Sequence, residues 1–459
     1  MKKNRTLIYI TVLLFLGITT QAQNKKWSLQ ECVEYAIKNN ITIQQTALDV
    51  ETAQITKTAA IGNFLPTINA NGSHSWNIGL NQNITTGLLE NQTTQFTSAG
   101  LNANVNIYNG LQNQNKLRRA NLSILSSQYQ LAKIQNDISL NIANAFLQIL
   151  FSKENLKVQQ NLLVNDEKQL NRTQELVIGG VVPRGDLLDS KATVAADKQK
   201  VILAENTLFI SKLSLAQLLQ LPDFQNFDVS DEETNTINKS TILNENPETI
   251  LEKAKQERVE LKIAKTNLAL AEKDIIIAKG AYQPSVLGFY GFSSRVSYAD
   301  RVLFNQSTGT ATVSGPLPFF DQFSNNKGHN FGVQLNIPIL NGFSVKNNVA
   351  RSKIAYDRSK IASKQAELDL ERNVYNAIND AKGALNAYES SIIAFDARRE
   401  ALNYAKEKFA VGMMNSFNLN QSQTLFSQAE SEVLRTKFDY IFKVKVVEFY
   451  FGIPLSKKQ

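Results

Sequence analysis

The chain has 459 residues, 49 basic against 41 acidic side chains, and a single cysteine. Three basic residues lie in the first five positions, so the rest of the chain carries a net charge of only +5 (46 − 41). Charges of both signs alternate along the helical stretches, which is typical of a solvated surface and excludes a nucleic-acid-binding protein. One cysteine excludes an intrachain disulfide. The sequence has no glycine-rich phosphate loop, HExxH or nucleophile motif, so we predict no enzyme, no metal site and no cofactor.

The N-terminus has the features of an export signal. Basic residues at positions 2, 3 and 5 precede a short apolar segment, and Thr20-Gln21-Ala22 is a suitable cleavage site. Residues 1–22 are therefore predicted to be a signal peptide. The apolar segment is too short to span a bilayer stably, and a membrane anchor is the alternative interpretation. No later segment is predicted to be a spanning helix, so membrane contact is expected through strands or a helix surface.

The remainder of the sequence repeats itself. Shifting it by 232 positions places Asn109-Gly110 on Asn341-Gly342, and a shift of 218 places Pro66 on Pro284. A period this long is too large for a solenoid, so we predict one unit built twice. The two repeats are expected at residues 23–222 and 249–455, joined by a polar connector over residues 223–248.

Each repeat is expected to contain short helices, a strand pair, a very long helix and a further helix. Pro66 and Pro284 end a helical pattern and begin a pattern with a period of two. The long helices contain no proline and extend about 100 Å at 1.5 Å per residue, so they need partners along their length. The expected ranges are a strand pair at about 66–108, a long helix at about 111–177 and a helix at 186–220, and in the second repeat a strand pair at about 284–340, a long helix at about 343–409 and a helix at 417–451.

In the strand segments, apolar residues alternate with asparagine, serine, threonine and glutamine. Ile68, Ala70 and Trp76 share one side of their strand, as do Phe331 and Val333 of theirs. Such alternation is typical of a membrane β-barrel, with lipid outside and water inside, although an ordinary half-buried sheet gives the same pattern. The candidates for an aromatic belt at the lipid–water boundary, with core packing as the alternative, are Trp76, Tyr108, Tyr290 and Phe292.

Four strands in one chain cannot close a barrel. The smallest bacterial barrels have eight strands, and an open edge leaves backbone N–H and C=O groups unpaired in lipid. Other copies must therefore complete the sheet; three chains give twelve strands and two give eight. Long polar loops, expected at residues 79–95 and 299–327, would join the strands on the outer side.

Several segments match a known family in order and in sequence. They are the opening helix SLQECVEYAIKNN (residues 28–40), and VNIYNG and IPILNG, where each second strand meets its long helix. With the duplication and the turns after the long helices, they give a chain that resembles the TolC-like outer-membrane efflux proteins. The resemblance implies a mainly α fold with a membrane β-barrel. Four strands per chain would form a twelve-stranded barrel in a homotrimer, and long antiparallel helices would form a periplasmic α-barrel.

The resemblance also implies a location and partners. The barrel would lie in the lipid of the outer membrane, with the helices extending into the periplasm. A periplasmic adaptor (membrane fusion protein) and an inner-membrane pump would dock at the lower end of the helices.

The turns that follow the long helices are the candidate entrance of the channel. The family has the motif G-x5-D-x-L there; Asp186 fits it, whereas Asn418 replaces the acid. In a trimer each acid would form a ring that attracts cations and repels itself, so Asp186 and Asp189 are candidates for a gate. Capping of the following helix is the alternative explanation of Asp186. The entrance candidates are Asp186, Asp189, Arg184, Asn418 and Gln421; the turn residues and candidate adaptor contacts are Gly180, Pro183, Gly412 and Asn415.

These features predict a passive exit duct for small toxic compounds or drugs. The energy would come from the inner-membrane pump, because the sequence contains no nucleotide-binding motif. Two alternatives stay open. Within the family, the duct would serve type I protein secretion. In a different class, the chain would be a periplasmic coiled-coil structural protein that transports nothing.

Overall fold

The computed structural model describes residues 26–83, 87–222, 224–231 and 241–453. The predicted signal peptide, residues 1–22, lies outside the described residues, as does part of the predicted connector. The chain divides into two compact units. Unit 1 takes residues 1–48, 129–262 and 364–459, and unit 2 takes residues 49–128 and 263–363.

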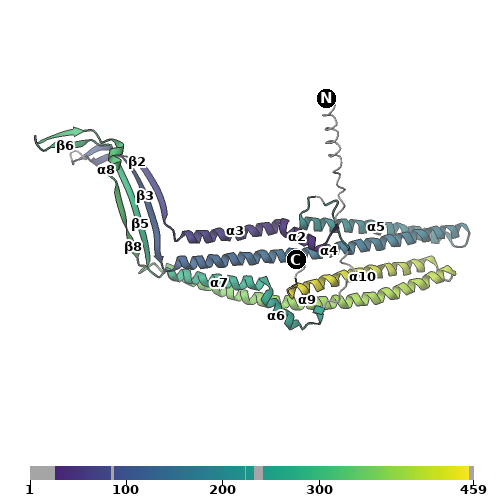
Figure 1. Cartoon of the computed structure of the whole chain (residues 1–459). Helices are drawn as coiled ribbons and strands as arrows, with labels where there is room; N and C mark the ends of the chain where they lie inside the picture. Colours follow the sequence, from purple (N-terminus) through teal and green to yellow (C-terminus); the bar gives the residue numbers. More distant parts are fainter. Residues whose placement is uncertain (1–25, 84–86, 223, 232–240, 454–459) are drawn as a thin grey trace, which may run out of the picture. The chain divides into compact units, whose positions relative to one another are not determined.

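The same order of elements occurs twice along the chain (Figure 1). Each series has a helix of 11 residues, a helix of 22, two strands of one sheet, a helix of 67, and a last helix of 36 or 35 residues. The first series is α2 (Leu29–Asn39), α3 (Ile41–Gly62), β2 (Thr67–Gln82), β3 (Leu89–Asn109), α4 (Gln112–Ile178) and α5 (Arg184–Leu219). The second is α6 (Pro247–Glu257), α7 (Val259–Gly280), β5 (Ser285–Ser297), β8 (Gly328–Asn336), α9 (Ser344–Ala410) and α10 (Ser416–Tyr450).

Unit 2 contains a four-stranded antiparallel sheet in the order β2-β3-β5-β8. Pro66 and Pro284 stand directly before β2 and β5, where each helical segment gives way to a strand. β2 and β8 form the two edges, and neither edge pairs with a further strand among the described residues. The sheet therefore stays open within this part of the chain, as the strand count predicts.

The two faces of this sheet differ in chemistry. Cross-strand partners share a face, and alternate residues of a strand point to opposite faces. The registers place Ala70, Leu101 and Phe292 on one face, and Asn69 and Asn102 on the other. The first face also carries the exposed Ile68, Phe331, Val333 and Leu335, together with the predicted belt residues Trp76, Tyr108 and Tyr290. The second carries Asn71, Asn104, Asn330, Gln334 and Asn336.

The first hairpin loop is shorter than its composition indicates. The expected loop over residues 79–95 is wrong, because β2 continues to Gln82 and β3 begins at Leu89. The alternation extends through Ile78 and Leu80, which pair with Thr93 and Asn91, so the polar residues here belong to the strands.

The second expected loop, residues 299–327, contains regular structure. β6 (Arg301–Asn305) and β7 (Thr310–Ser314) form a hairpin, and α8 (Phe319–Asn325) follows. Gln322 of α8 binds the backbone of Ser297 twice: its Oε1 accepts from the N–H at 3.0 Å and its Nε2 donates to the carbonyl at 2.9 Å. These two bonds hold α8 against the end of β5, which composition alone could not indicate.

Two residues with left-handed backbone turn each second strand into its long helix. Gly110 and Leu111 have φ of 65° and 58°, and Gly342 and Phe343 have φ of 57° and 63°. Gly110 also lies against Gly280, because a Cβ on Gly110 would stand 2.1 Å from the Gly280 carbonyl oxygen. Backbone angle and close approach both require glycine at position 110.

Unit 1 has two hydrophobic cores that hold its helices. The first joins α2, α4 and α5 with β4 (Asp228–Val229), and the fully buried Cys32, Phe146 and Leu215 belong to it. The second joins α6, α9 and α10 through Ile250, Val374 and Val447. β1 (Lys26–Trp27) pairs in parallel with β4 beside the first core. Each core therefore fixes one long helix to a shorter helix that precedes it in the chain.

α5 is the one helix in the described chain that is long and apolar enough to cross a membrane. The expectation that no segment after the N-terminus meets this criterion is wrong. The criterion depends on length and composition alone, and a helix rich in alanine and aliphatic residues meets it without lying in lipid. Little of this stretch is buried in its own chain, and Ile202, Leu203, Phe209 and Ile210 are exposed. These side chains lack a cover within the described chain.

Candidate functional site

The turn between α4 and α5 is closed by glycine and proline. Gly180 has φ of 70°, as expected of a residue that follows a helix end. α5 begins earlier than expected: Pro183 is its N-cap, with extended φ and ψ of −63° and 150° and no side-chain cap. The capping explanation of Asp186 is therefore wrong. Asp186 lies within the first turn, where a carboxylate interacts favourably with the helix dipole.

The turn between α9 and α10 has a side-chain cap. Gly412 has φ of 76°. Asn415 is the N-cap of α10, and its Oδ1 accepts from the backbone N–H of Asn418 at 3.0 Å. Asn415 thus has a structural role, and the proposed adaptor contact at this residue remains a prediction.

A cavity of about 450 Å³ lies between α5 and α10 near these turns. It brings together two of the predicted entrance residues, Asp189 and Gln421, whereas Arg184, Asp186 and Asn418 are not among its lining residues. Asn420 Nδ2 donates to Thr193 Oγ1 across it at 3.4 Å. The lining of the cavity contains one acid, Asp189, which forms no ion pair with the described residues.

Two further cavities continue this one along α10. The next, of about 280 Å³, shares Thr424 and Gln428 with it, and the third, of about 400 Å³, shares Phe151 and Arg435 with the second. We call the three together the α10 groove. α10 forms one wall throughout; the other wall is α5 near the turn and α4 further up.

The exposed residues of α10 follow the groove closely. Gln421, Gln428, Glu432, Arg435 and Asp439 are exposed at spacings of 7, 4, 3 and 4 residues, and all five line it. This spacing keeps them on one face of the helix. The groove is therefore one continuous solvent-facing strip of the helical unit.

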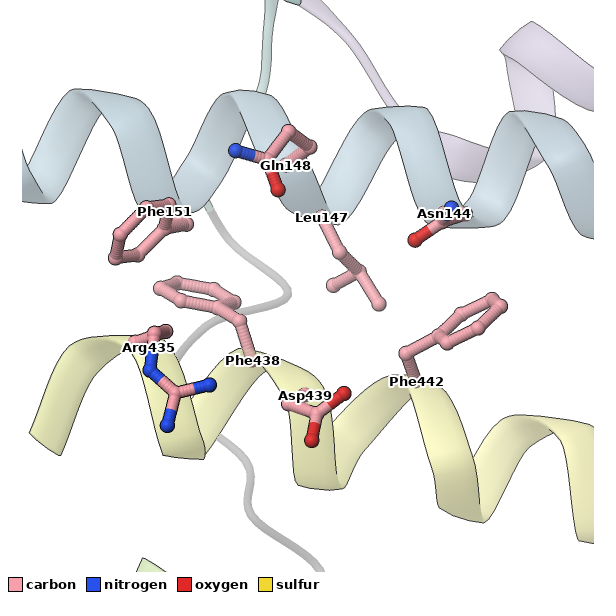
Figure 2. A pocket seen from close by; sticks show the side chains of 8 residues that line it. All are labelled: Asn144, Leu147, Gln148, Phe151, Arg435, Phe438, Asp439 and Phe442. Atoms are coloured by element: carbon pink, nitrogen blue, oxygen red, sulfur yellow. The ribbon is translucent and has the colours of Figure 1, made fainter. Parts of the chain in front are cut away.

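The upper end of the groove is an aromatic pocket, shown in Figure 2. Phe151 and Leu147 of α4 face Phe438 and Phe442 of α10 across it. Arg435 is held by Glu432, which accepts from its Nε at 2.8 Å and from its Nη2 at 2.6 Å. That bond lowers the pKa of Glu432 below its usual range, so both side chains keep their charges at neutral pH.

Three buried polar side chains meet where α4, α5 and α10 come together. Asp166 and Asp197 are 5% and 2% exposed, and Gln423 is also buried. Gln423 Nε2 donates to Asp166 Oδ1 at 2.5 Å, and Lys200 Nζ lies 2.9 Å from Asp197 Oδ1. Burial, and then the neighbouring Asp197 carboxylate, raise the pKa of Asp166 to about 8. Asp166 therefore holds a proton at neutral pH.

Sequence reasoning missed this acid pair and the aromatic pocket. Asp166 and Gln423 are 257 residues apart, and each stands in a polar helical stretch with no feature that separates it from solvated neighbours. The available signal was the spacing of Phe438 and Phe442, which places two aromatic rings on one helix face. The facing element, α4, cannot be identified from that spacing.

Comparison with known proteins agrees with this architecture. The family model described as "Outer membrane efflux protein" matches residues 32–220 and 250–441. The outer membrane protein TolC of Vibrio cholerae is 23% identical over 449 residues, which cover 97% of this chain and 94% of that protein.

Two further proteins are similar over most of the chain. The pyoverdine export outer membrane protein OpmQ of Pseudomonas aeruginosa is 21% identical over 388 residues, covering 83% of this chain and 74% of that protein. The crystal structure of the Campylobacter jejuni CmeC outer membrane channel has the same fold, with a TM-score of 0.73 and 16% identity; the match covers 95% of this chain and 87% of that one. Since the family model spans most of the sequence, the chain belongs to the outer membrane efflux protein family.

Proposed function

We propose that three copies of this chain form a duct through the outer membrane. The observation that carries the proposal is the open sheet, whose edge strands β2 and β8 have no partner among the described residues. Such edges cannot face lipid, because their N–H and C=O groups would stay unpaired. Pairing β8 of one copy with β2 of the next gives twelve strands in a closed barrel. The asparagine-rich face then lines a water-filled interior, and the apolar face meets the lipid.

Exposed apolar residues on three helices support the assembly of copies. On α9, Ile354, Ile361, Leu368 and Tyr375 are exposed at intervals of seven residues. Ile41, Leu48 and Ile55 of α3, and Ile202 and Phe209 of α5, follow the same interval. A strict seven-residue apolar repeat is the seam of a coiled coil. These seams have no cover among the described residues of one chain, and neighbouring copies in a trimeric helical tunnel would supply it.

The duct is passive and its entrance lies at the helix turns. Asp189 faces the cavity beside Gln421, so three copies would present a ring of three carboxylates there. Such a ring attracts divalent cations and repels itself, and both effects bear on whether the entrance is open. Gly180, Pro183, Gly412 and Asn415 form the tips that a periplasmic adaptor would contact, with an inner-membrane pump supplying the energy.

The cargo we propose is small molecules. One relative, OpmQ, is named a pyoverdine export outer membrane protein, and the aromatic pocket of the α10 groove has the size of a small-ligand site. Type I protein secretion is the second candidate within the family. Growth of a deletion strain on toxic compounds, compared with its secreted proteins, separates the two cargo classes.

Planar-bilayer recording tests the duct directly. The purified full-length protein should insert as a trimer and conduct ions, with block by divalent cations from the periplasmic side. Asp189→Asn should weaken that block about tenfold or more, because it removes the charge of the ring. Asp186→Asn is the matched control: it makes the same change three residues away, outside the cavity, and should alter the block much less. A protein that stays monomeric and never conducts would overturn the proposal in favour of a structural coiled coil.

A further inference from the structure

The aromatic pocket at the upper end of the α10 groove combines two features that together select one ligand class. Phe151, Phe438 and Phe442 provide three aromatic rings around a volume of about 400 Å³. Asp439 projects from the same wall between Phe438 and Phe442 (Figure 2). We propose that this pocket is a binding site for amphiphilic organic cations on their way through the duct; the proposal rests on the proposed function and names a cargo class for it.

The charges around the pocket favour a cation. The lining of the pocket carries one positive group, Arg435, and one negative group, Asp439. The adjoining cavity adds Glu432 and Lys200, and Lys200 pairs with Asp197. The Arg435 guanidinium is bound by the Glu432 carboxylate through two hydrogen bonds. Asp439 is exposed and makes no hydrogen bond or ion pair with the described residues, although its charge interacts electrostatically with Arg435. Glu432 therefore neutralises Arg435, and the Asp439 carboxylate is the charged group of the pocket lining that is available to a ligand.

The aromatic rings also attract cations. Neither water nor lipid provides this attraction. The face of an aromatic ring attracts a cation within about 6 Å, with a free energy of about 0.5–2 kcal/mol that grows as water is excluded. The rings of Phe438 and Phe151 approach each other from opposite helices, and Phe442 lies on the other side of Leu147 (Figure 2). A neutral apolar molecule would gain only the burial of its surface, and an anion would meet Asp439 at short range.

Two residues that line the pocket, Leu147 and Phe438, belong to the first core, and the other lining residues lie on faces of α4 and α10 that point away from the short helices. Successive helix residues are about 100° apart. On α4, the residues packed with α2 (Ile142, Phe146 and Ile149) lie about 200° from those that line the pocket (Asn144, Gln148 and Phe151). α10 repeats this division.

On α10, the core residues Tyr440, Val444 and Val447, which pack with α6 and α9, lie opposite the pocket residues Arg435, Asp439 and Phe442. In a closed helical tunnel, α2 and α6 must lie outside, since inside they would fill the passage. The pocket then opens on the inner wall, where three copies would form a ring of cation sites.

Binding of tetraphenylphosphonium to the purified trimer tests the proposal, with tetraphenylborate as an anion of nearly the same shape. The phosphonium should bind and the borate should not. Asp439→Asn should weaken phosphonium binding about tenfold, which corresponds to about 1.4 kcal/mol. Phe442→Leu should weaken it severalfold, because it keeps an apolar side chain and removes a ring. Glu432→Gln should also weaken it, because it frees Arg435 to pair with Asp439.

Asp396→Asn is the control for charge and for partition of the probe into detergent. Asp396 is a half-exposed acid on α9, outside the groove, that pairs with Arg399. The Asp396→Asn variant should bind the phosphonium as the unaltered protein does, because its lost charge lies outside the pocket. Since detergent takes up the same amount of probe in both samples, any difference between them would come from the protein.

Equal binding of the two ions, or unchanged phosphonium affinity in Asp439→Asn, would overturn the cation site. Bilayer conductance of the same preparations separates this outcome from failure of the duct. A trimer that conducts but does not select the phosphonium contradicts the pocket alone.

Discussion

The buried Asp166–Asp197 pair makes the stability of the helical unit depend on pH. In the folded chain the pKa of Asp166 is about 8, against 3.8 for an ordinary aspartate. Between these two values the folded chain binds a proton that the unfolded chain has lost, so stability falls as pH rises. The slope for one proton is about 1.4 kcal/mol per pH unit, and it ends above the folded pKa.

We therefore expect the trimer to dissociate at a lower temperature at pH 9 than at pH 6, and Asp166→Asn to reduce that difference. An asparagine at 166 donates an N–H without titrating, so it keeps a hydrogen bond to Asp197 at both pH values. The substitution leaves the groups around the site in place. They are Lys200, Gln423 and the Lys198–Glu167 ion pair. Dissociation of the trimer on heating, followed by gel migration at both pH values, is the measurement. Equal pH dependence in the two proteins would show that another group controls it.

At the scale of single helices, the exposed apolar repeat of α9 is predicted to be a contact between copies. Ile361 is 71% exposed in the single chain. Burying such a side chain at an interface contributes about 1.5–3 kcal/mol, and threefold symmetry repeats the gain at every seam. Ile361→Glu should therefore abolish or strongly reduce the trimer, as measured by size-exclusion chromatography with light scattering.

Lys360→Glu is the matched control for this change. Lys360 is the neighbouring exposed residue of α9, about 100° around the helix from Ile361 and outside the seven-residue repeat. It should assemble as the unaltered chain does. If the Ile361→Glu variant forms trimers of normal stability, the apolar repeat of α9 is not part of the interface.

The period of the apolar residues predicts the type of each element correctly, whereas the residue composition of the turns predicts the ends of the elements poorly. The alternation up to Ile78 predicts a strand, whereas the asparagines and threonines that follow have the composition of a loop; they nevertheless lie in β2 and β3, which pair with each other across the hairpin. Pro183 is the N-cap of α5, because the N-cap position accepts extended residues other than the preferred polar ones. Asp189 could be proposed from its place after a turn. The buried polar cluster could not be proposed in this way, because it becomes a site only where three helices meet. Its members are Asp166, Asp197 and Gln423.

At the scale of the assembly, the open sheet predicts which strands pair between copies. β2 and β8 are separated by two strands, so their axes lie about 14 Å apart at about 4.8 Å per strand. A disulfide needs Cα atoms less than about 7 Å apart. Cysteines placed one on each edge strand therefore cannot join within a chain, and any disulfide between them must join two copies.

Suitable positions are Thr67 and Asn69 on β2, and Gln334 and Asn336 on β8. The strand registers put all four on the polar face of the sheet. We expect at least one of the four double-cysteine combinations to give covalently closed trimers on a non-reducing gel, and single variants to give none. Because a ring of three leaves no free edge, the ladder should stop at three copies. Ladders that stop at two copies would require an eight-stranded barrel. Continuation beyond three would indicate an open assembly, which could not form a sealed wall in lipid.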